Sequence, residues 1–312
     1  MAASNPPEVQ VAAFCCPRCR GPLASAVGDL NCPGCGLSYP VRDGIPDFCP
    51  GDDFYEGRWA ATNMSAGSLR NWLVKKERFF VQQLRSRRGK VLDLGCGGGW
   101  RLFTEVGPVT GVDLSHSSLQ RARAVYDSVA RADLGALPFP DDSYDFVLSS
   151  DVLGHVACER KERVWREIHR VLKSGGMTIH YIEADADDPL MRFAKRHPDL
   201  YERHIVAPEG HIGLETPEAI TSRFRQAGFL PIVEWPTYRG IMYIDRVVQL
   251  FDNEYKRRSA PIWALVTVCK TLWKAGPVGL AVNVLVAGLV EVADRTCPES
   301  WAGGMLVCYQ KR

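Results

Sequence analysis

One ten-residue stretch constrains the fold of this chain more than any other feature. Residues 90–99 read Lys-Val-Leu-Asp-Leu-Gly-Cys-Gly-Gly-Gly, an apolar strand that ends in an acid and enters a glycine-rich turn. A second apolar run ends in an acid, Asp113, about twenty residues later. A βαβ unit that binds a nucleotide uses this spacing to place a carboxylate under a ribose. The two segments therefore predict a bound cofactor that contains adenosine.

The composition is that of an ordinary globular protein. The 312 residues carry a net charge of +2, so no global field attracts nucleic acid, although a local basic patch is allowed. The first residues have neither the positive start nor the apolar core of a secretory signal, so we expect a cytoplasmic protein. Four of the eleven cysteines form two Cys-x-x-Cys pairs, which fits a reducing compartment without structural disulfides.

Apolar strands alternate with segments of helical spacing from about residue 54 onwards. The predicted parallel strands are Val91–Leu94, Val109–Val112, Val129–Ala132, Phe146–Ser149 and Met177–Ile182. Amphipathic helices are predicted over Arg160–Leu172 and, after the N-cap Thr216, over Pro217–Ala227. Strands Leu230–Trp235 and Met305–Gln310 follow. We predict an α/β fold with a doubly wound, mostly parallel, seven-stranded Rossmann-like sheet.

Two cysteine pairs define a small N-terminal module, which we place at residues 1–50. Cys16 and Cys19 form the first pair, and Cys32 and Cys35 the second, about a dozen residues later. Two such turns can present four thiolates at the corners of a tetrahedron, which structural Zn²⁺ requires. We expect these four to bind zinc and Cys15 and Cys49 to remain free thiols.

The module also resembles a known family over Phe14–Phe48. The run Tyr-Pro-Val-Arg-Asp-Gly-Ile-Pro at residues 39–46 carries this resemblance. It is similar to the zinc-ribbon family that serves as an activating subunit for tRNA, rRNA and release-factor methyltransferases. The resemblance implies a scaffolding role beside a methyltransferase.

The glycine spacing distinguishes between adenosine cofactors. Glycines at 95, 97 and 99 do not give the Gly-x-Gly-x-x-Gly of a dinucleotide site, and Asp93 precedes them within the turn. A carboxylate there repels a pyrophosphate but suits a cationic amino-acid tail. The chain resembles class I S-adenosylmethionine-dependent methyltransferases over residues 79–182, in the motifs Asp93–Gly99, Asp113, Ala132–Leu134, Leu137–Val147 and Arg170–Gly176. The cofactor-binding residues that we predict are Asp93, Gly95, Cys96, Gly97, Asp113, Leu114, Asp133, Leu134 and Ser149.

Candidate catalytic residues follow the fourth and fifth strands, where ligands meet open α/β sheets. Methyl transfer mainly needs alignment of the nucleophile, helped by a base when the nucleophile is a hydroxyl. His155 is the candidate base, although a histidine here equally supports the next helix. Asp151 is expected to orient it or to contact substrate, and Tyr181 to line the pocket unless it is core. His211 could reach the substrate from its loop, but we expect it near the rim.

A tetrapeptide typical of some methyltransferases is missing after the fourth strand. Class I enzymes that methylate the exocyclic amine of adenine or a glutamine amide usually carry Asn/Asp-Pro-Pro-Tyr there, whereas this chain reads Ser-Ser-Asp-Val from residue 149. This departure argues against those two acceptors.

A long insertion, residues 237–303, separates the last two strands, so the methyltransferase domain is predicted to comprise 54–236 and 304–312. The basic run Lys256–Arg258 precedes an apolar helical segment, and Val278–Val292 is apolar but slightly short of the twenty residues of a spanning helix. The insertion could cap the site, contact a membrane through 256–292, form a homodimer, or pack on the enzyme itself. Basic residues near Trp263 and Trp273 favour the membrane surface.

These features lead to a ranked set of functions. The first is S-adenosylmethionine-dependent methyl transfer to a small-molecule or lipid-linked acceptor of glycan or isoprenoid type, by a cytoplasmic protein that also contacts membranes. The alternative is methylation of tRNA, rRNA or another translation component, with nucleic acid as the weaker partner. The third is a non-catalytic protein that binds the cofactor.

Overall fold

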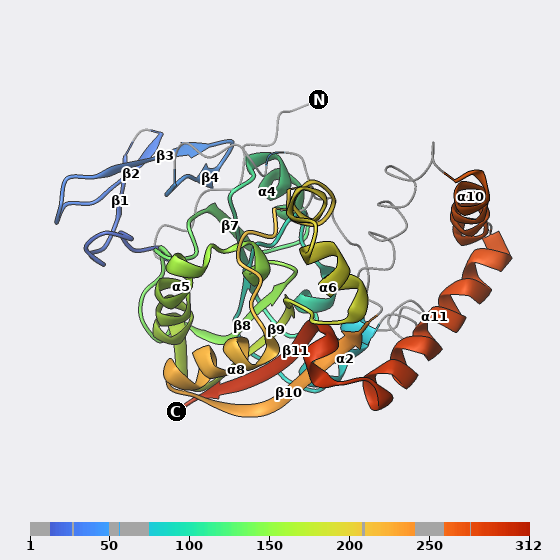
Figure 1. The fold of residues 1–312 in the computed structure, drawn as a ribbon. Helices are drawn as coiled ribbons and strands as arrows, with labels where there is room; N and C mark the ends of the chain where they lie inside the picture. Colours follow the sequence, from blue (N-terminus) through green and yellow to red (C-terminus); the bar gives the residue numbers. More distant parts are fainter. Residues whose placement is uncertain are drawn as a thin grey trace.

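One seven-stranded sheet organises the described part of the chain (Figure 1). The computed structural model describes residues 13–26, 28–49, 56, 75–207, 210–240, 259–274 and 276–312. The strands of this sheet are β5 (Val91–Leu94), β6 (Val109–Asp113), β7 (Ser128–Arg131), β8 (Tyr144–Ser150), β9 (Leu172–Glu183), β10 (Phe229–Arg239) and β11 (Ala302–Lys311). Their order is β10-β11-β9-β8-β5-β6-β7; β11 is antiparallel to both neighbours and the other pairs are parallel. The predicted α/β fold is confirmed.

Helices cover both faces of the sheet. They are α2 (Lys75–Leu84), α3 (Arg101–Thr104), α4 (His116–Ala122), α5 (Cys158–Val171), α6 (Pro189–Lys195), α7 (Pro198–Tyr201) and α8 (Pro217–Gln226), with short turns at Leu153–His155 and Glu202–Val206. Trp165 of α5 and Phe224 of α8 belong to one buried cluster, whereas Phe80 of α2 and Phe103 of α3 belong to a second. Two covered faces explain why the central parallel strands are mostly apolar on both sides.

The N-terminal module is a small antiparallel sheet that docks on the edge of the large one. Its strands are β1 (Ala24–Ala26), β2 (Asp29–Asn31), β3 (Ser38–Arg42) and β4 (Ile45–Pro46). Just after β4, Asp47 pairs in parallel with Arg131 of edge strand β7, and the Phe48 amide donates to the Arg131 carbonyl at 2.8 Å. The rings of Phe14 and Phe139 lie 5.7 Å apart within a shared buried cluster. The module and the large sheet therefore share one core.

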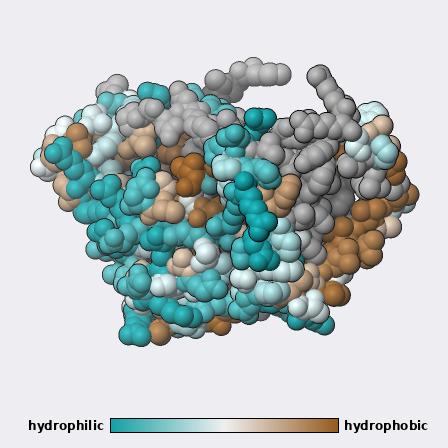
Figure 2. Space-filling view, viewed as in Figure 1, coloured by the Kyte–Doolittle hydropathy of each residue, from teal (hydrophilic) through white to brown (hydrophobic). Residues whose placement is uncertain are grey.

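Two consecutive helices stand out from the body between β10 and β11 (Figure 1). They are α10 (Ala260–Lys274) and α11 (Gly276–Thr296). The base of α11 is tied down, because Asp294 accepts a hydrogen bond from Lys75 Nζ of α2 at 2.6 Å. The rest of α11 exposes apolar side chains, which Figure 2 shows as a hydrophobic patch on the same side of the molecule. Lys256–Arg258, the predicted basic run, lies outside the described residues.

The length of α11 differs from the expectation. The predicted apolar run of Val278–Val292 was too short to span a membrane, but the helix continues to Thr296, and its stretch Pro277–Thr296 is long and apolar enough by length and composition. Among the described helices it alone meets that criterion, with a mean hydropathy of 1.6 and 18% of the stretch buried. The extension arises because Ala293 and Asp294 are buried against the body and hold the last turn in place.

Candidate functional site

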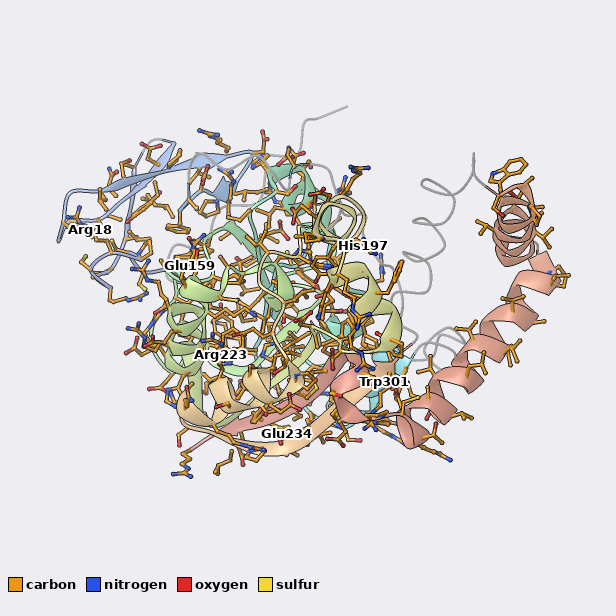
Figure 3. The ribbon with its side chains drawn as sticks, in the orientation of Figure 1. Arg18, Glu159, His197, Arg223, Glu234 and Trp301 are labelled. Carbon is orange, nitrogen blue, oxygen red and sulfur yellow. The ribbon has the colours of Figure 1, made fainter. Side chains whose placement is uncertain are left out.

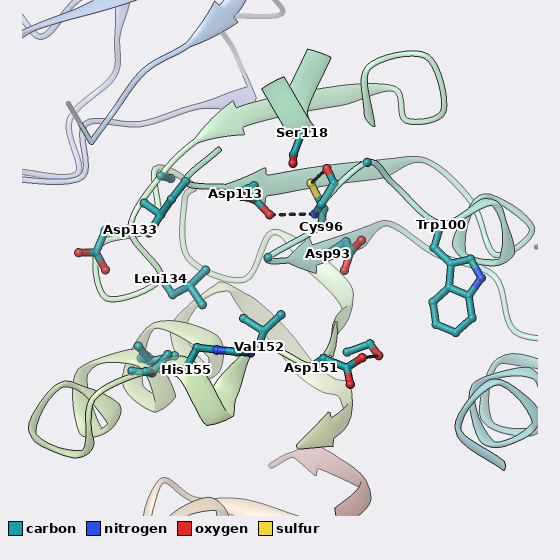
Figure 4. Close-up of a pocket in the computed structure, with 18 of the residues that line it drawn as sticks. Asp93, Cys96, Trp100, Asp113, Ser118, Asp133, Leu134, Asp151, Val152 and His155 are labelled. Carbon is teal, nitrogen blue, oxygen red and sulfur yellow. Dashed lines mark hydrogen bonds between the residues drawn. The ribbon is translucent and has the colours of Figure 1, made fainter. Parts of the chain in front are cut away.

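A pocket of about 540 Å³ opens at the carboxyl ends of β5, β6, β8 and β9 (Figure 4). This is where open α/β sheets bind ligands, and the volume suits a nucleoside-sized molecule. Of the residues predicted from sequence, the pocket is lined by Asp93, Gly95, Cys96, Gly97, Asp113, Leu114, Asp133, Leu134, Asp151 and His155. The sequence therefore identified residues that the fold brings together around one cavity.

The glycine-rich turn owes its shape to glycines with left-handed backbone at positions 95, 97 and 99. Gly95 has a φ of 60°, and a Cβ there would lie 2.5 Å from Val152 Cγ2. Gly97 has a φ of 51°, and its amide donates a 2.8 Å hydrogen bond to Asp113 Oδ2. This bond appears in Figure 4 and links the turn after β5 to the acid that ends β6. Glycine is therefore required at Gly95 by both its left-handed backbone and the lack of room beside Val152, and at Gly97 by its left-handed backbone.

Asp93 lies below the turn and is buried, with 4% of its surface exposed. Its Oδ2 accepts a 2.6 Å hydrogen bond from the Tyr126 hydroxyl, which in turn accepts one from the Trp100 amide at 2.7 Å. Burial raises the pKa of Asp93 to about 7, although the Tyr126 hydrogen bond opposes the shift. Because its pKa lies near neutral pH, the Asp93 carboxylate is strongly stabilised when a cationic group of a ligand binds beside it.

The other end of the pocket combines an apolar side chain with one partly buried acid. Leu134 lines it, while Asp133 forms an ion pair with Arg160 in the first turn of α5. The second oxygen of Asp133, Oδ1, accepts a hydrogen bond from the Gly135 amide at 2.8 Å. Leu134 can thus pack against a flat heterocycle, and Asp133 can accept hydrogen bonds from its polar edge.

Two of the predicted residues lie outside the lining of this pocket. Ser149 is fully buried, and its hydroxyl lies 2.7 Å from His180 Nδ1. The neighbouring Ser150 lines the pocket instead, because successive residues of a strand point to opposite faces. Tyr181 is core, 1% exposed, with its ring 5.9 Å from that of Tyr238.

The far side of the pocket holds the candidate catalytic histidine. His155 is 9% exposed at its side chain, and its Nδ1 lies 3.1 Å from the Gly210 carbonyl oxygen. Burial lowers the pKa of His155 below its ordinary value. The carboxylate that lies 3.9 Å from His155 Nε2 is that of Glu183, the last residue of β9. His211, which we expected near the rim, is instead buried with its ring centroid 4.8 Å from that of His155.

Asp151 also lines the pocket, but its carboxylate pairs with a lysine. Lys76 Nζ of α2 lies 2.5 Å from Asp151 Oδ2, and Asp151 adopts a left-handed backbone with a φ of 60°. Burial alone would lower the pKa of Lys76, yet the adjacent carboxylate raises it above the ordinary value. The lysine therefore remains charged, and the pair joins α2 to the end of β8.

Sequence reasoning missed several lining residues that come from other parts of the chain. Lys76, Trp100, Phe103, Arg160 and Glu183 all line the pocket. Trp100 Nε1 is buried and has no hydrogen-bond partner among the described residues, so it is available to a ligand. A usable signal existed only for Glu183, which follows Tyr181 by two residues along the same strand.

The four paired cysteines come together in the N-terminal module. Their sulfur atoms all lie within 4.8 Å of one another, with Cys16 Sγ 3.6 Å from Cys35 Sγ and Cys19 Sγ 3.3 Å from Cys32 Sγ. Four thiolates around a tetrahedral Zn²⁺, each about 2.3 Å from it, would lie about 3.8 Å apart. The cluster therefore fits a structural zinc ion.

Comparison with known proteins places both parts of the chain. A family model described as a methyltransferase domain matches residues 92–180, and one described as Trm112p-like protein matches residues 14–44. A protein of Encephalitozoon cuniculi named as a methyltransferase is 35% identical over 133 residues, 42% of this chain. The ubiquinone/menaquinone biosynthesis C-methyltransferase UbiE of Serratia proteamaculans is 31% identical over 171 residues, 50% of this chain.

The matches are partial in length. This chain spans 61% of the Encephalitozoon protein and 64% of the Serratia protein. A solved complex of the Haloferax volcanii Trm112 methyltransferase activator with a methyltransferase is 20% identical, with a TM-score of 0.46, and the match covers 77% of this chain and 90% of that one. The chain is therefore similar to the methyltransferase-domain family over residues 92–180 and to the Trm112p-like family over residues 14–44.

Proposed function

We propose that this protein transfers a methyl group from S-adenosylmethionine, with Zn²⁺ as a structural ion in its N-terminal module. The observation that carries the proposal is the convergence of Asp93, Asp113 and Asp133 on one pocket that also holds His155 and Glu183. Asp113 would hold the ribose hydroxyls, Asp93 the cationic amino-acid tail, and Leu134 the adenine. The histidine side of the pocket is left for the acceptor.

The protein itself contributes alignment and exclusion of water. Methyl transfer is an in-line displacement, so the pocket must hold the acceptor atom opposite the sulfonium. Phe103 of α3 and Trp100, the residue before α3, line the pocket and narrow it. Val152 lies beneath the glycine turn and closes the pocket there. His155 and Glu183 line the part of the pocket to which we assign the acceptor.

We further propose an acceptor of isoprenoid type that is reached at a membrane surface by a protein of the cytoplasm. The support is α11, whose outward side chains are about half exposed although apolar: Val278, Leu280, Val284, Leu285, Leu289 and Val292. A patch of this size on one helix favours insertion into the interfacial region of a bilayer. The similarity to UbiE, a methyltransferase named for quinone biosynthesis, supports the same class of acceptor.

Release of S-adenosylhomocysteine tests this proposal against its alternatives. The full chain is incubated with S-adenosylmethionine and, separately, with lipid extract, soluble metabolites, or tRNA and ribosomes. We expect product only with lipid extract. Product only with tRNA or ribosomes would replace the lipid acceptor by the alternative that the Trm112p-like module favours. Cofactor binding without turnover on any fraction would support the non-catalytic alternative.

Vesicle flotation tests the role of α11. We expect the protein to float with vesicles that contain anionic lipid, and the double variant Leu285→Glu, Leu289→Glu to remain at the bottom. Ile232→Glu is the matched control, because Ile232 is a similarly exposed apolar residue on the edge strand β10. A wild-type protein that stays at the bottom and forms a dimer in light scattering would show that α11 is a dimerisation arm.

A further inference from the structure

Three buried side chains from separate elements converge at the acceptor side of the pocket. His155 ends the short helical turn after β8, Glu183 ends β9, and His211 lies in the loop before α8. The loop is held tightly against the turn, because the Gly213 amide donates to the Gly154 carbonyl at 3.0 Å. A Cβ on Gly213 would lie 1.8 Å from the Val156 carbonyl oxygen, so only glycine permits this approach. Close backbone packing of the loop against the turn therefore brings together three side chains that are far apart in the sequence.

The ligand atoms of this cluster have the spacing of a metal site. Glu183 Oε1 lies 3.3 Å from His211 Nε2 and 3.9 Å from His155 Nε2, and the three groups can place one ligand atom each within 4.8 Å of one another. Three such atoms bound at about 2.1 Å to one divalent cation would lie roughly 3.0 to 3.4 Å apart. A small inward movement of His155 completes that arrangement.

The hydrogen bonds of His155 present the correct atom to a cation. The Gly210 carbonyl can only accept, so His155 Nδ1 carries the proton and donates to it across 3.1 Å. In the neutral ring, Nε2 is then unprotonated and points its lone pair toward Glu183. A backbone carbonyl that fixes the tautomer of a histidine in this way is the usual outer partner of a metal ligand.

The charge of Glu183 is otherwise poorly compensated. Its side chain is 6% exposed, and among the described residues no lysine or arginine lies within ion-pair distance of it. In the same part of the structure, Glu183 Oε2 and His211 Nδ1 are buried without a hydrogen-bond partner. The described polar partners of Glu183 are thus two imidazoles, with His211 Nε2 within hydrogen-bond distance of Oε1 at 3.3 Å. A cation bound between the carboxylate and these rings would compensate its charge.

We propose that His155, Glu183 and His211 form a binding site for a divalent first-row metal ion, separate from the zinc of the N-terminal module. Two imidazoles and one carboxylate suit Zn²⁺, Fe²⁺ or Co²⁺ and leave coordination positions open. Those positions face the pocket, because His155 and Glu183 both line it. The site would take an acceptor oxygen from a hydroxyl group attached to or conjugated with the methylated position.

A role for this metal ion in methyl transfer rests on the proposed function. The binding of the ion to His155, Glu183 and His211 does not. A cation held by His155, Glu183 and His211 would acidify the acceptor O–H, whose proton would leave to solvent. The resulting oxygen, or a carbon conjugated with it, forms the new bond to the methyl carbon. The bond between the methyl carbon and the sulfonium sulfur breaks, and S-adenosylhomocysteine leaves with the electron pair of that bond.

Cobalt titration of the metal-stripped full chain tests the site directly. We expect two equivalents of Co²⁺: one with the intense charge-transfer absorption of cysteine ligands, and one with only weak visible bands. Glu183→Gln and His211→Ala should each weaken the second equivalent at least tenfold and leave the cysteine absorption unchanged, which also shows that the variant has folded. His197→Ala, an exposed histidine, is the matched control and should retain both equivalents.

Two outcomes separate this proposal from the proposed function. One equivalent of Co²⁺ in the wild type, abolished by Cys16→Ser with Cys32→Ser, would overturn the second metal site, whether or not S-adenosylmethionine binds. Two equivalents of Co²⁺ without any binding of S-adenosylmethionine in calorimetry would leave the metal site standing and refute the methyltransferase function.

Discussion

Arg20 of the N-terminal module donates a hydrogen bond through Nη2 to Glu167 Oε1 of α5 across 2.7 Å. Its Nη1 also donates to the Leu137 carbonyl at 2.8 Å, and the Cys15 amide donates to the Pro138 carbonyl at 2.9 Å. The loop from Leu137 to Pro138 leads into β8, at whose end the pocket opens. The Trm112p-like module therefore supports its own methyltransferase domain within a single chain.

We predict that Arg20→Ala lowers the free energy of unfolding by about 1 to 3 kcal/mol, because it removes two charge-assisted hydrogen bonds. Glu167 keeps its pairing with Arg170 at 2.8 Å, so no buried charge is left alone. Chemical denaturation measures the change. Arg18→Ala is the control, since Arg18 lies in the same cysteine turn but points away from the methyltransferase domain (Figure 3). Equal stability of the two variants would contradict the supporting role.

Local signals explain what could be predicted from the sequence. Asp93 and Asp113 each end an apolar strand, and parallel strands bring such ends to one edge of a sheet. The signal failed at Ser149, because β8 is apolar on both faces and its alternation does not show which serine faces the pocket. Lys76 and Trp100 were not predicted, since their positions depend on how α2 and the turn before α3 pack. Glu183 was missed because the predicted strand ended one residue too early.

Binding of S-adenosylmethionine should strengthen as the pH rises from 5.5 to 7.5. The pKa of Asp93 in the free protein is about 7, raised mainly by burial, and only the ionised carboxylate attracts the cationic tail. Affinity should approach a tenfold gain per pH unit below 7. Calorimetry in buffers of different ionisation enthalpy should also detect release of a proton on binding. Asp93→Asn should bind more weakly, without this dependence; an unchanged pH profile in that variant would contradict the assignment.

His180 should make the protein less stable in acid. Burial lowers the pKa of His180 to about 3. Below pH 6.5 the unfolded chain therefore binds a proton at this histidine, whereas the native state does not until the pH approaches 3. The free energy of unfolding should therefore fall by about 2 kcal/mol from this group between pH 6.5 and pH 5. His180→Gln should remove that part of the slope, whereas exposed His197→Gln should not. Identical slopes in all three proteins would refute this account.

Asp294 should control the anchoring of α11. It accepts hydrogen bonds from Lys75 Nζ at 2.6 Å, from the Arg239 amide at 3.0 Å and from the Thr237 hydroxyl. Asp294→Ala leaves the buried Lys75 ammonium with weaker partners, at a cost of about 3 kcal/mol. Limited proteolysis should cut residues 276–296 sooner in this variant. Glu299→Ala removes only the exposed acid that pairs with Arg239 at 3.3 Å, and Arg239 keeps its hydrogen bond to the Cys297 carbonyl, so this variant should digest like the wild type.

Isothermal titration calorimetry with S-adenosylmethionine tests the central claim most directly. We expect one molecule to bind per chain, and Asp113→Ala to weaken binding about 10- to 100-fold through loss of its hydrogen bonds to the ribose. Asp199→Ala, which changes an exposed acid on α7, should bind as the wild type does. Circular dichroism checks that the variants fold. Absence of binding by the wild type, or undiminished binding by a folded Asp113→Ala variant, would contradict the proposed cofactor site.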